Sequence, residues 1–96
     1  MKKDVMQFNL SVMFLREKKR VVAYAPALDL STSGKTLNEA KKRFTEIARL
    51  FFEEIMKKGT TSNVLTDLGW HRVKRDWKAP TVISQEAETF RVPVHV

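Results

Sequence analysis

The chain has 96 residues, of which 43% are hydrophobic and 30% are charged, and its formal net charge is +7. A chain of this length makes one domain and hides only about 60–68% of its unfolded surface, which leaves little room for a deep enclosed active site. Because the chain has no cysteine, disulfides and thiolate metal sites are excluded. No segment has the roughly 20 apolar residues of a membrane span, so we expect a cytoplasmic protein without membrane contact.

Three strands are predicted in the N-terminal third of the chain. Residues 5–15 alternate between apolar and polar side chains, which is the period of a half-buried strand. Residues 16–19 form a charged turn into a second strand over 20–25, and this link is so short that the two strands must be antiparallel. Residues 28–33 alternate again as a third strand, after which Gly34 supplies a turn.

The clearest local pattern is a helix over residues 36–58. Thr36 and Glu39 have the spacing of a capping box, in which the hydroxyl accepts a backbone N–H and the carboxylate reaches back to the cap. Apolar residues then recur at helical spacing in a broad stripe, and Gly59 ends the helix. The sequence therefore predicts one long amphipathic helix.

The elements after this helix are shorter. A second, short helix is expected to stop at Gly69, and residues 70–75 are predicted as a fourth strand. Residues 90–96 alternate between apolar and other side chains. Pro93 makes that segment either an edge strand or an arm that pairs with a partner.

The predicted order, β-β-β-α-short α-β plus a C-terminal edge strand, indicates an α+β fold. Its antiparallel sheet is covered on one face by the long helix. We assign residues 1–76 to this domain and residues 77–96 to a C-terminal extension that carries the edge or partner-pairing strand.

Two short motifs resemble the HicB-like antitoxin family. Val-Val-Ala-Tyr-Ala-Pro-Ala-Leu at 21–28 is similar to the family's V-A-Y-x-P-x-L strand pair, and Ser-Gly-Lys-Thr-Leu-Asn-Glu-Ala at 33–40 is similar to its G-x-T-x-x-E-A helix start. The resemblance covers residues 5–59. It implies a truncated ribonuclease-H-like domain that binds and silences HicA, a small basic toxin that cleaves RNA. Many family members also carry a DNA-reading helical module, but the proline-containing tail after Trp77 is too short for one.

Catalytic and metal-binding residues are not expected. Two-metal cleavage of a phosphodiester needs several converging carboxylates. Asp29 is the only acidic residue placed to face across the sheet, and it has no evident companion. We assign His71 and His95 to surface or packing positions, because two histidines without cysteine do not make a zinc site. The sequence therefore predicts a protein that is not an enzyme and binds no cofactor or metal.

The residues predicted to contact partners are aromatic, apolar or basic. Tryptophans interleaved with basic residues are typical of single-stranded nucleic-acid binding, although both rings can instead pack in the core. The terminal strand can cover an exposed sheet edge of a neighbouring molecule. The predicted partner-binding residues are Tyr24, Trp70, Arg72, Lys74, Trp77, Phe90, Val92 and Val94.

The leading hypothesis is an antitoxin-like binding protein that neutralises a small RNA-cleaving toxin of the HicA type by surface occlusion, and we expect it to be a homo-oligomer. The alternative hypothesis is a single-stranded nucleic-acid-binding module that uses the basic and aromatic patch. The positive net charge of +7 favours a polyanionic partner. That charge is spread along the chain, however, as is also typical of ordinary surface charge.

Overall fold

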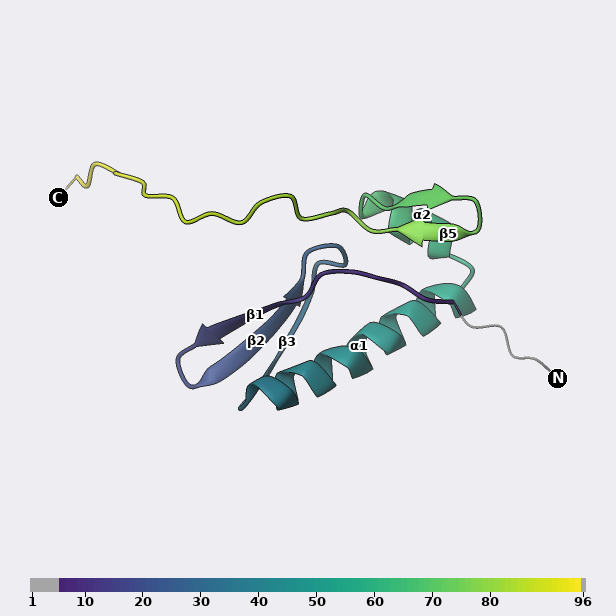
Figure 1. Ribbon diagram of the computed structural model, residues 1–96, viewed down its shortest axis with the longest axis horizontal. Helices are drawn as coiled ribbons and strands as arrows, with labels where there is room; N and C mark the ends of the chain where they lie inside the picture. The colour runs from purple at the N-terminus through teal and green to yellow at the C-terminus, as the bar shows by residue number, and fades with distance from the viewer. Residues whose placement is uncertain (1–5, 96) are drawn as a thin grey trace.

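The computed structural model describes residues 6–95, which form an α+β fold (Figure 1). Three strands make one antiparallel sheet in the order β1-β2-β3, and two further strands make a separate hairpin. The α+β class and the long helix are therefore confirmed. The elements are β1 (Met13–Glu17), β2 (Arg20–Ala25), β3 (Leu30–Gly34), α1 (Leu37–Lys57), α2 (Thr61–Asp67), β4 (His71–Val73) and β5 (Asp76–Lys78).

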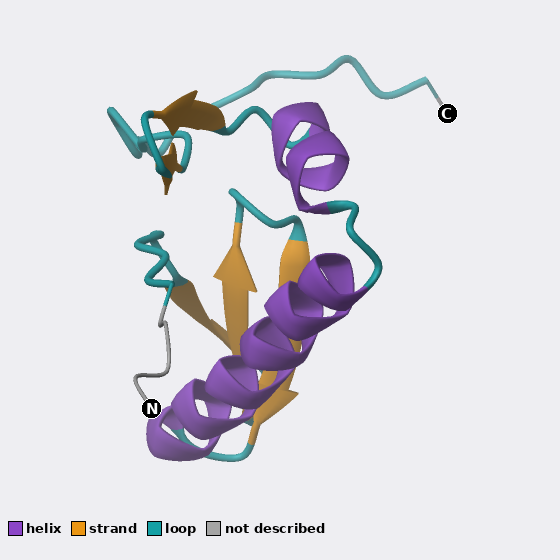
Figure 2. Ribbon diagram, turned by 90° about the vertical axis from the view of Figure 1, so that its right-hand side faces the viewer, coloured by secondary structure: helices purple, strands orange, loops and turns teal. Residues whose placement is uncertain are grey.

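The side chains of the central strand β2 alternate between a covered and an uncovered face of the sheet. Val21, Ala23 and Ala25 are buried beneath α1, which crosses one face of the sheet (Figure 2). The two alanines are fully buried, and their small side chains let the helix approach the sheet closely. Val22 and Tyr24 alternate with them and point to the opposite face, which no element covers within residues 6–95.

The start of α1 is fixed by a side-chain cap. The Thr36 hydroxyl accepts a hydrogen bond from the backbone N–H of Glu39 at 3.1 Å, as the capping box predicts. The Glu39 carboxylate does not reach back to the cap. It lies 3.1 Å from the guanidinium of Arg43 instead, one helical turn onward. Gly59 follows the helix with a φ of +69°, which glycine adopts without strain.

Gly34 has a different role from the turn predicted for it. It is the last residue of β3 and is buried where the chain enters α1. A Cβ atom at this position would lie 2.7 Å from the backbone nitrogen of Ala40. The glycine is therefore needed because the helix backbone passes very close to the strand.

A second core lies at one end of the sheet and helix. Leu65 of α2 and Trp70 are almost fully buried there, and the Trp70 indole N–H donates a 2.8 Å hydrogen bond to the Ala27 carbonyl. Phe8 stacks on Phe52 with ring centroids 4.0 Å apart, and both rings meet Trp70 edge-on. This cluster joins the N-terminal segment, the end of α1 and the chain after α2.

The first strand is shifted along the chain relative to its prediction over 5–15. Pairing begins at Met13 and continues through Glu17 into the predicted turn, because the turn itself is only Lys18 and Lys19. Residues 6–12 are extended without a strand partner, and they run across the end core instead. Val5 lies outside the described residues.

The fourth strand was predicted as one segment, 70–75, within the main sheet. The chain instead turns at Lys74, with a φ of +58°, so that β4 pairs with β5 in its own two-stranded sheet. Trp77 of β5 is buried in the end core. The packed body therefore continues past the boundary expected at residue 76.

The predicted C-terminal strand is not formed within the chain. Residues 79–95 contain no helix or strand and leave the body as an extended segment (Figure 1). The radius of gyration is 17.0 Å, against about 13 Å for a compact chain of 100 residues. A strand needs a neighbour for its N–H and C=O groups, and this segment has none among residues 6–95. Val96 lies outside the described residues.

No helix in residues 6–95 combines the length and the apolar character required to cross a membrane.

Candidate binding surface

The uncovered face of the sheet carries a small apolar surface, which we call the outer face. In the antiparallel register, Leu15 lies opposite Val22 and Met13 lies opposite Tyr24, so these four side chains share one face. Leu15 is 46% exposed, and the other three are half-buried. Ser31 and Ser33 of β3 complete this face as the partners of Tyr24 and Val22, respectively, and give it a polar margin.

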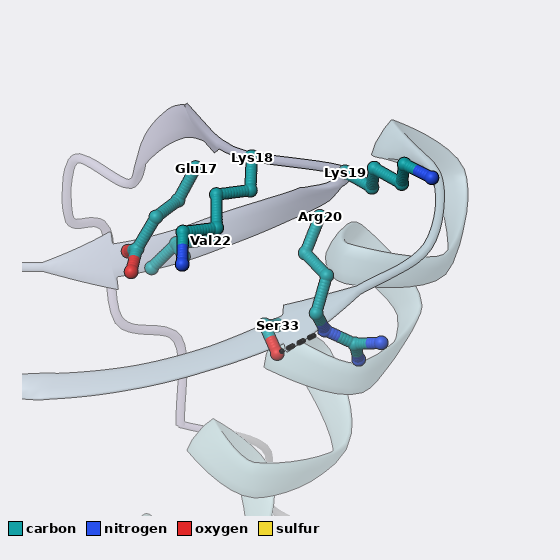
Figure 3. A pocket seen from close by; sticks show the side chains of 6 residues that line it. All are labelled: Glu17, Lys18, Lys19, Arg20, Val22 and Ser33. Carbon is teal, nitrogen blue, oxygen red and sulfur yellow. Dashed lines mark hydrogen bonds between the residues drawn. The ribbon is translucent and has the colours of Figure 1, made fainter.

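An open hollow of about 610 Å³ lies at the turn end of this face. Val22 supplies apolar lining, and the chain around the β1–β2 turn supplies charged side chains (Figure 3). Arg20 is held in place because its Nε donates a 3.1 Å hydrogen bond to the Ser33 hydroxyl. The lining residues are Glu17, Lys18, Lys19, Arg20, Val22 and Ser33.

Tyr24, a predicted partner-binding residue, lies on the outer face and is fixed by a side-chain contact. Its hydroxyl donates a 3.1 Å hydrogen bond to Oδ1 of Asp29, in the turn before β3. This hydrogen bond is the main reason why the pKa of Tyr24 is raised, with desolvation and the negative charge of Asp29 adding to it. Asp29 has a φ of +49°, a region that aspartate tolerates better than most residues.

The two predicted tryptophans are inside the protein. Trp70 is 2% exposed and Trp77 is 9% exposed, and both belong to the end core. Stacking on single-stranded nucleic acid requires a ring with a free face. Neither tryptophan ring is therefore available for the basic and aromatic patch that the alternative hypothesis requires.

The basic residues predicted with these tryptophans lie on the β4–β5 hairpin. The Arg72 guanidinium lies 5.8 Å from the centroid of the Trp77 ring, and its Nε donates a 3.2 Å hydrogen bond to the Lys74 carbonyl. Arg72 thus covers Trp77 and braces the turn. Both Arg72 and Lys74 are exposed to solvent.

Phe90, Val92 and Val94 are presented to solvent along the C-terminal segment. Their exposed fractions are 80%, 75% and 82%. The structure thus divides the predicted partner-binding residues into three places: Tyr24 on the outer face, residues 70–77 in or on the end core, and residues 90–94 on the segment.

The acidic and histidine side chains do not converge. Among residues 6–95, no group of three or more His, Asp or Glu side chains is placed to hold a metal ion. Asp29 is hydrogen-bonded to Tyr24, and Glu39 is paired with Arg43. These pairs are local and exposed, as in ordinary surface electrostatics.

The apolar part of the outer face was missed by sequence reasoning. The alternation of residues 5–15 between apolar and polar side chains predicts a single apolar face, and that face is the one that α1 covers. The missing signal was the short turn at Lys18 and Lys19, because that turn sets Leu15 opposite Val22. Only the register between the two strands makes these residues neighbours.

No protein-family model, no curated protein and no solved structure matches this chain.

Proposed function

We propose that this chain is a HicB-like antitoxin that neutralises a small RNA-cleaving protein of the HicA type by covering its surface. The outer face of the sheet is the contact surface in this proposal. The supporting observation is that α1 covers only one face of the sheet, while Leu15 and its neighbours leave the other apolar and open. Exposed apolar surface rimmed by polar groups is typical of protein interaction sites.

The motif residues that carry the family resemblance support the proposal through their positions. Residues 21–25 form most of β2, the central strand, whose side chains alternate between the covered face and the outer face. Thr36 caps α1, and Gly34 admits the helix against β3. The resemblance thus falls on the unit that builds the outer face.

The chemistry of the outer face suits binding better than catalysis. Tyrosine is enriched in interface hot spots, and Tyr24 is already held by Asp29, so a partner need not order it on binding. Among residues 6–95, the acids near this face are Glu17, at the end of β1, and Asp29, in the turn before β3, and they make no cluster. Occlusion needs only this apolar surface and a complementary partner.

Charge gives the proposal a specific consequence. Lys18, Lys19 and Arg20 line the hollow next to the outer face, and a HicA-type partner is itself basic. The contact would then be driven by apolar burial against like-charge repulsion, which salt screens. We expect the affinity to hold or increase as salt rises, the opposite of binding to a nucleic acid.

The test begins with the full chain as bait in lysate of the source cell. A small basic protein should be captured, and the same protein, once purified, should cleave RNA. Adding the chain in equimolar amount should stop that cleavage. Capture without ribonuclease activity, or cleavage that continues in the presence of the chain, would overturn the proposal.

Two matched substitutions locate the contact surface. Leu15→Glu places a charge on the outer face, and Leu50→Glu places the same charge on the exposed side of α1, where Leu50 is 57% exposed. Leu15→Glu should abolish inhibition of cleavage, while Leu50→Glu should leave it intact. Equal effects would show that the outer face is not the contact surface.

A further inference from the structure

The C-terminal segment has the pattern of a strand that lacks a neighbour. Phe90, Val92 and Val94 alternate with polar residues and proline, and all three are at least 75% exposed. Period-2 alternation of this kind is typical of a strand with one buried face. An extended apolar segment left in water is a site for pairing with another chain.

The main sheet has one edge that can receive such a strand. β1 pairs only with β2, so its outer edge is open within residues 6–95. The other edge strand, β3, lies against α1, and its Ser33 carbonyl accepts a 3.2 Å hydrogen bond from Arg43. β1 (Met13–Glu17) and the segment from Phe90 to Val94 each have five residues. The free edge is therefore β1, and the lengths match.

The segment overshoots the β1 of its own chain. Thr81 and Ser11 line the same two hollows, which places the start of the segment beside the start of the sheet. Phe90 is nine residues beyond Thr81, or about 30 Å when extended, whereas Glu17 is six residues beyond Ser11, or about 20 Å. Figure 1 shows the yellow end of the described segment well past the β1–β2 turn. Residues 90–94 therefore lie beyond the end of the sheet in their own chain.

We propose that residues 90–94 pair with the open edge of β1 in a second copy of this chain, and that the exchange is reciprocal. The segment runs in the same direction as its own β1 (Figure 1). A two-fold axis across the overshooting end therefore sets it antiparallel to the second copy's β1. The same operation returns the other segment to the first sheet, which closes a symmetric dimer.

Pro93 decides which side of the segment pairs. Backbone groups of successive strand residues point to opposite edges, so Phe90, Val92 and Val94 share one edge and Pro93 lies on the other. Proline has no N–H to give to a ladder. The edge of residues 90, 92 and 94 therefore faces β1. The Pro93 edge faces solvent and stops further strands from adding.

The same parity decides where the apolar side chains go. Glu17 and Arg20 flank a two-residue turn, so they form a hydrogen-bonded pair and β1 turns its Phe14 backbone groups outward. Residues opposite each other share a face, and Phe14 lies opposite Ala23 on the helix-covered face. Pairing Val92 with Phe14 therefore places the apolar side chains of the segment on the covered face, where they extend the core.

In this register, apolar residues lie opposite apolar residues, and an acidic residue lies opposite a basic one. With Val92 opposite Phe14, Val94 lies opposite Val12, which packs against the sheet–helix core. Glu88 then lies opposite Lys18 in the turn. The segment is acidic relative to the body, because Glu86 and Glu88 outnumber the single cation Arg91 in residues 79–95. Phe14, 37% exposed in the single chain, becomes covered.

The mass of the full chain in solution tests the proposal. Size-exclusion chromatography with light scattering should give twice the 11.1 kDa of one chain, over micromolar to millimolar concentrations. A single-chain mass throughout that range would overturn the proposal. Masses that grow continuously with concentration would overturn the closed, reciprocal exchange.

Two proline substitutions test the pairing edge. Val92→Pro removes an N–H from the edge that faces β1 and should halve the mass. Arg91→Pro removes one from the solvent edge and should keep the dimer mass. Both sites are exposed and outside helices and strands, so the folded body serves as its own control in circular dichroism. If the two variants behave alike, the edge assignment is wrong.

This inference stands apart from the proposed function. The dimer mass is measured on the chain alone, and inhibition of RNA cleavage is measured with the captured partner. Leu15→Glu changes the outer face and leaves the open edge of β1 intact, so it should lose inhibition but keep the dimer mass. Either proposal can therefore fail without the other.

Discussion

Large apolar residues occur both in the packed body, residues 6–78, and in the C-terminal segment, residues 79–95. Many of those in the body are buried, whereas those at the end of the segment are exposed. Trp70 and Trp77 are 2% and 9% exposed, whereas Phe90 is 80% exposed. The tryptophans have α2 and the end of α1 to pack against, whereas Phe90 has no such neighbour within the described part of the chain, residues 6–95. Burial depends on what the fold brings alongside a residue, so hydrophobicity alone did not predict which of these side chains are exposed.

The largest expected effect is a direct contrast between the two regions. Trp70→Ala should lower the free energy of unfolding by about 3–5 kcal/mol, because it empties the end core. Phe90→Ala should change it by less than about 0.5 kcal/mol in dilute solution, as for an exposed residue. Urea unfolding followed by circular dichroism measures both.

A milder variant guards against Trp70→Ala failing to fold. Trp70→Phe keeps an aromatic ring but removes the indole N–H that reaches the Ala27 carbonyl. Leaving that acceptor unpaired in the core should cost about 1–3 kcal/mol. If Trp70→Phe and Phe90→Ala are equally harmless, the contrast between body and segment fails.

Gly34→Ala tests the tight contact between sheet and helix within the body. The new Cβ would lie 2.7 Å from the Ala40 nitrogen, and backbone cannot move aside as the end of a side chain can. We expect a loss of about 1–3 kcal/mol in the same unfolding assay. The companion is Gly59→Asn, where there is open space around the Cβ and a φ of +69° that asparagine tolerates. It should cost less, and an equal loss would contradict the clash.

The cap of α1 gives a smaller effect. Thr36→Ala removes the acceptor for the Glu39 N–H and should cost about 1 kcal/mol. Thr36→Ser keeps a hydroxyl and should restore most of it. Thr45→Ala is a control, because Thr45 is an exposed mid-helix residue whose hydroxyl only donates to the Lys41 carbonyl. A larger loss at Thr45 than at Thr36 would refute the role of the cap.

The smallest effect concerns Tyr24, which is partly open to solvent like the segment but is held by a hydrogen bond. Its pKa is raised in the folded protein, so the hydrogen bond stabilises the fold below the ordinary pKa of tyrosine. That contribution is lost as pH rises through the raised pKa, because the phenolate cannot donate and is repelled by Asp29. Tyr24 is the only tyrosine, so phenolate absorbance reports it alone.

Asp29→Asn is the matched change for that titration. Asparagine keeps an oxygen acceptor and tolerates the φ of +49° at this position, but it removes the negative charge. The Tyr24 pKa should fall back toward its ordinary value. A titration curve unchanged by this substitution would mean that Asp29 does not control the tyrosine.

Helices and strands could be predicted from the sequence wherever interactions between residues close together in the chain determine them. The cap at Thr36, the apolar stripe and Gly59 are contained within one continuous segment, and α1 spans Leu37–Lys57 as they predict. The strand 20–25 was also found at its predicted bounds. Local hydrogen bonding and helical periodicity need no knowledge of distant residues.

The surfaces proposed for binding could be predicted from the sequence only in part. Tyr24 was predicted and lies on the outer face, but Leu15 was not, because its neighbour Val22 is set by register between strands. The segment 90–96 was predicted to be an edge strand or a partner-pairing arm. Its lack of a neighbour within residues 6–95 leaves the second possibility, which is the basis of the dimer proposal.

By itself, the sequence determined the class of fold, the long capped helix and the hairpin that precedes it, because these depend on spacing along the chain. Only the tertiary structure decided the rest: that Gly34 is needed for a close backbone approach, that Trp70 and Trp77 belong to a core, and that Phe90 does not. These outcomes depend on which distant segments meet. Pattern along a chain specifies which side of an element is apolar, but not what will cover it.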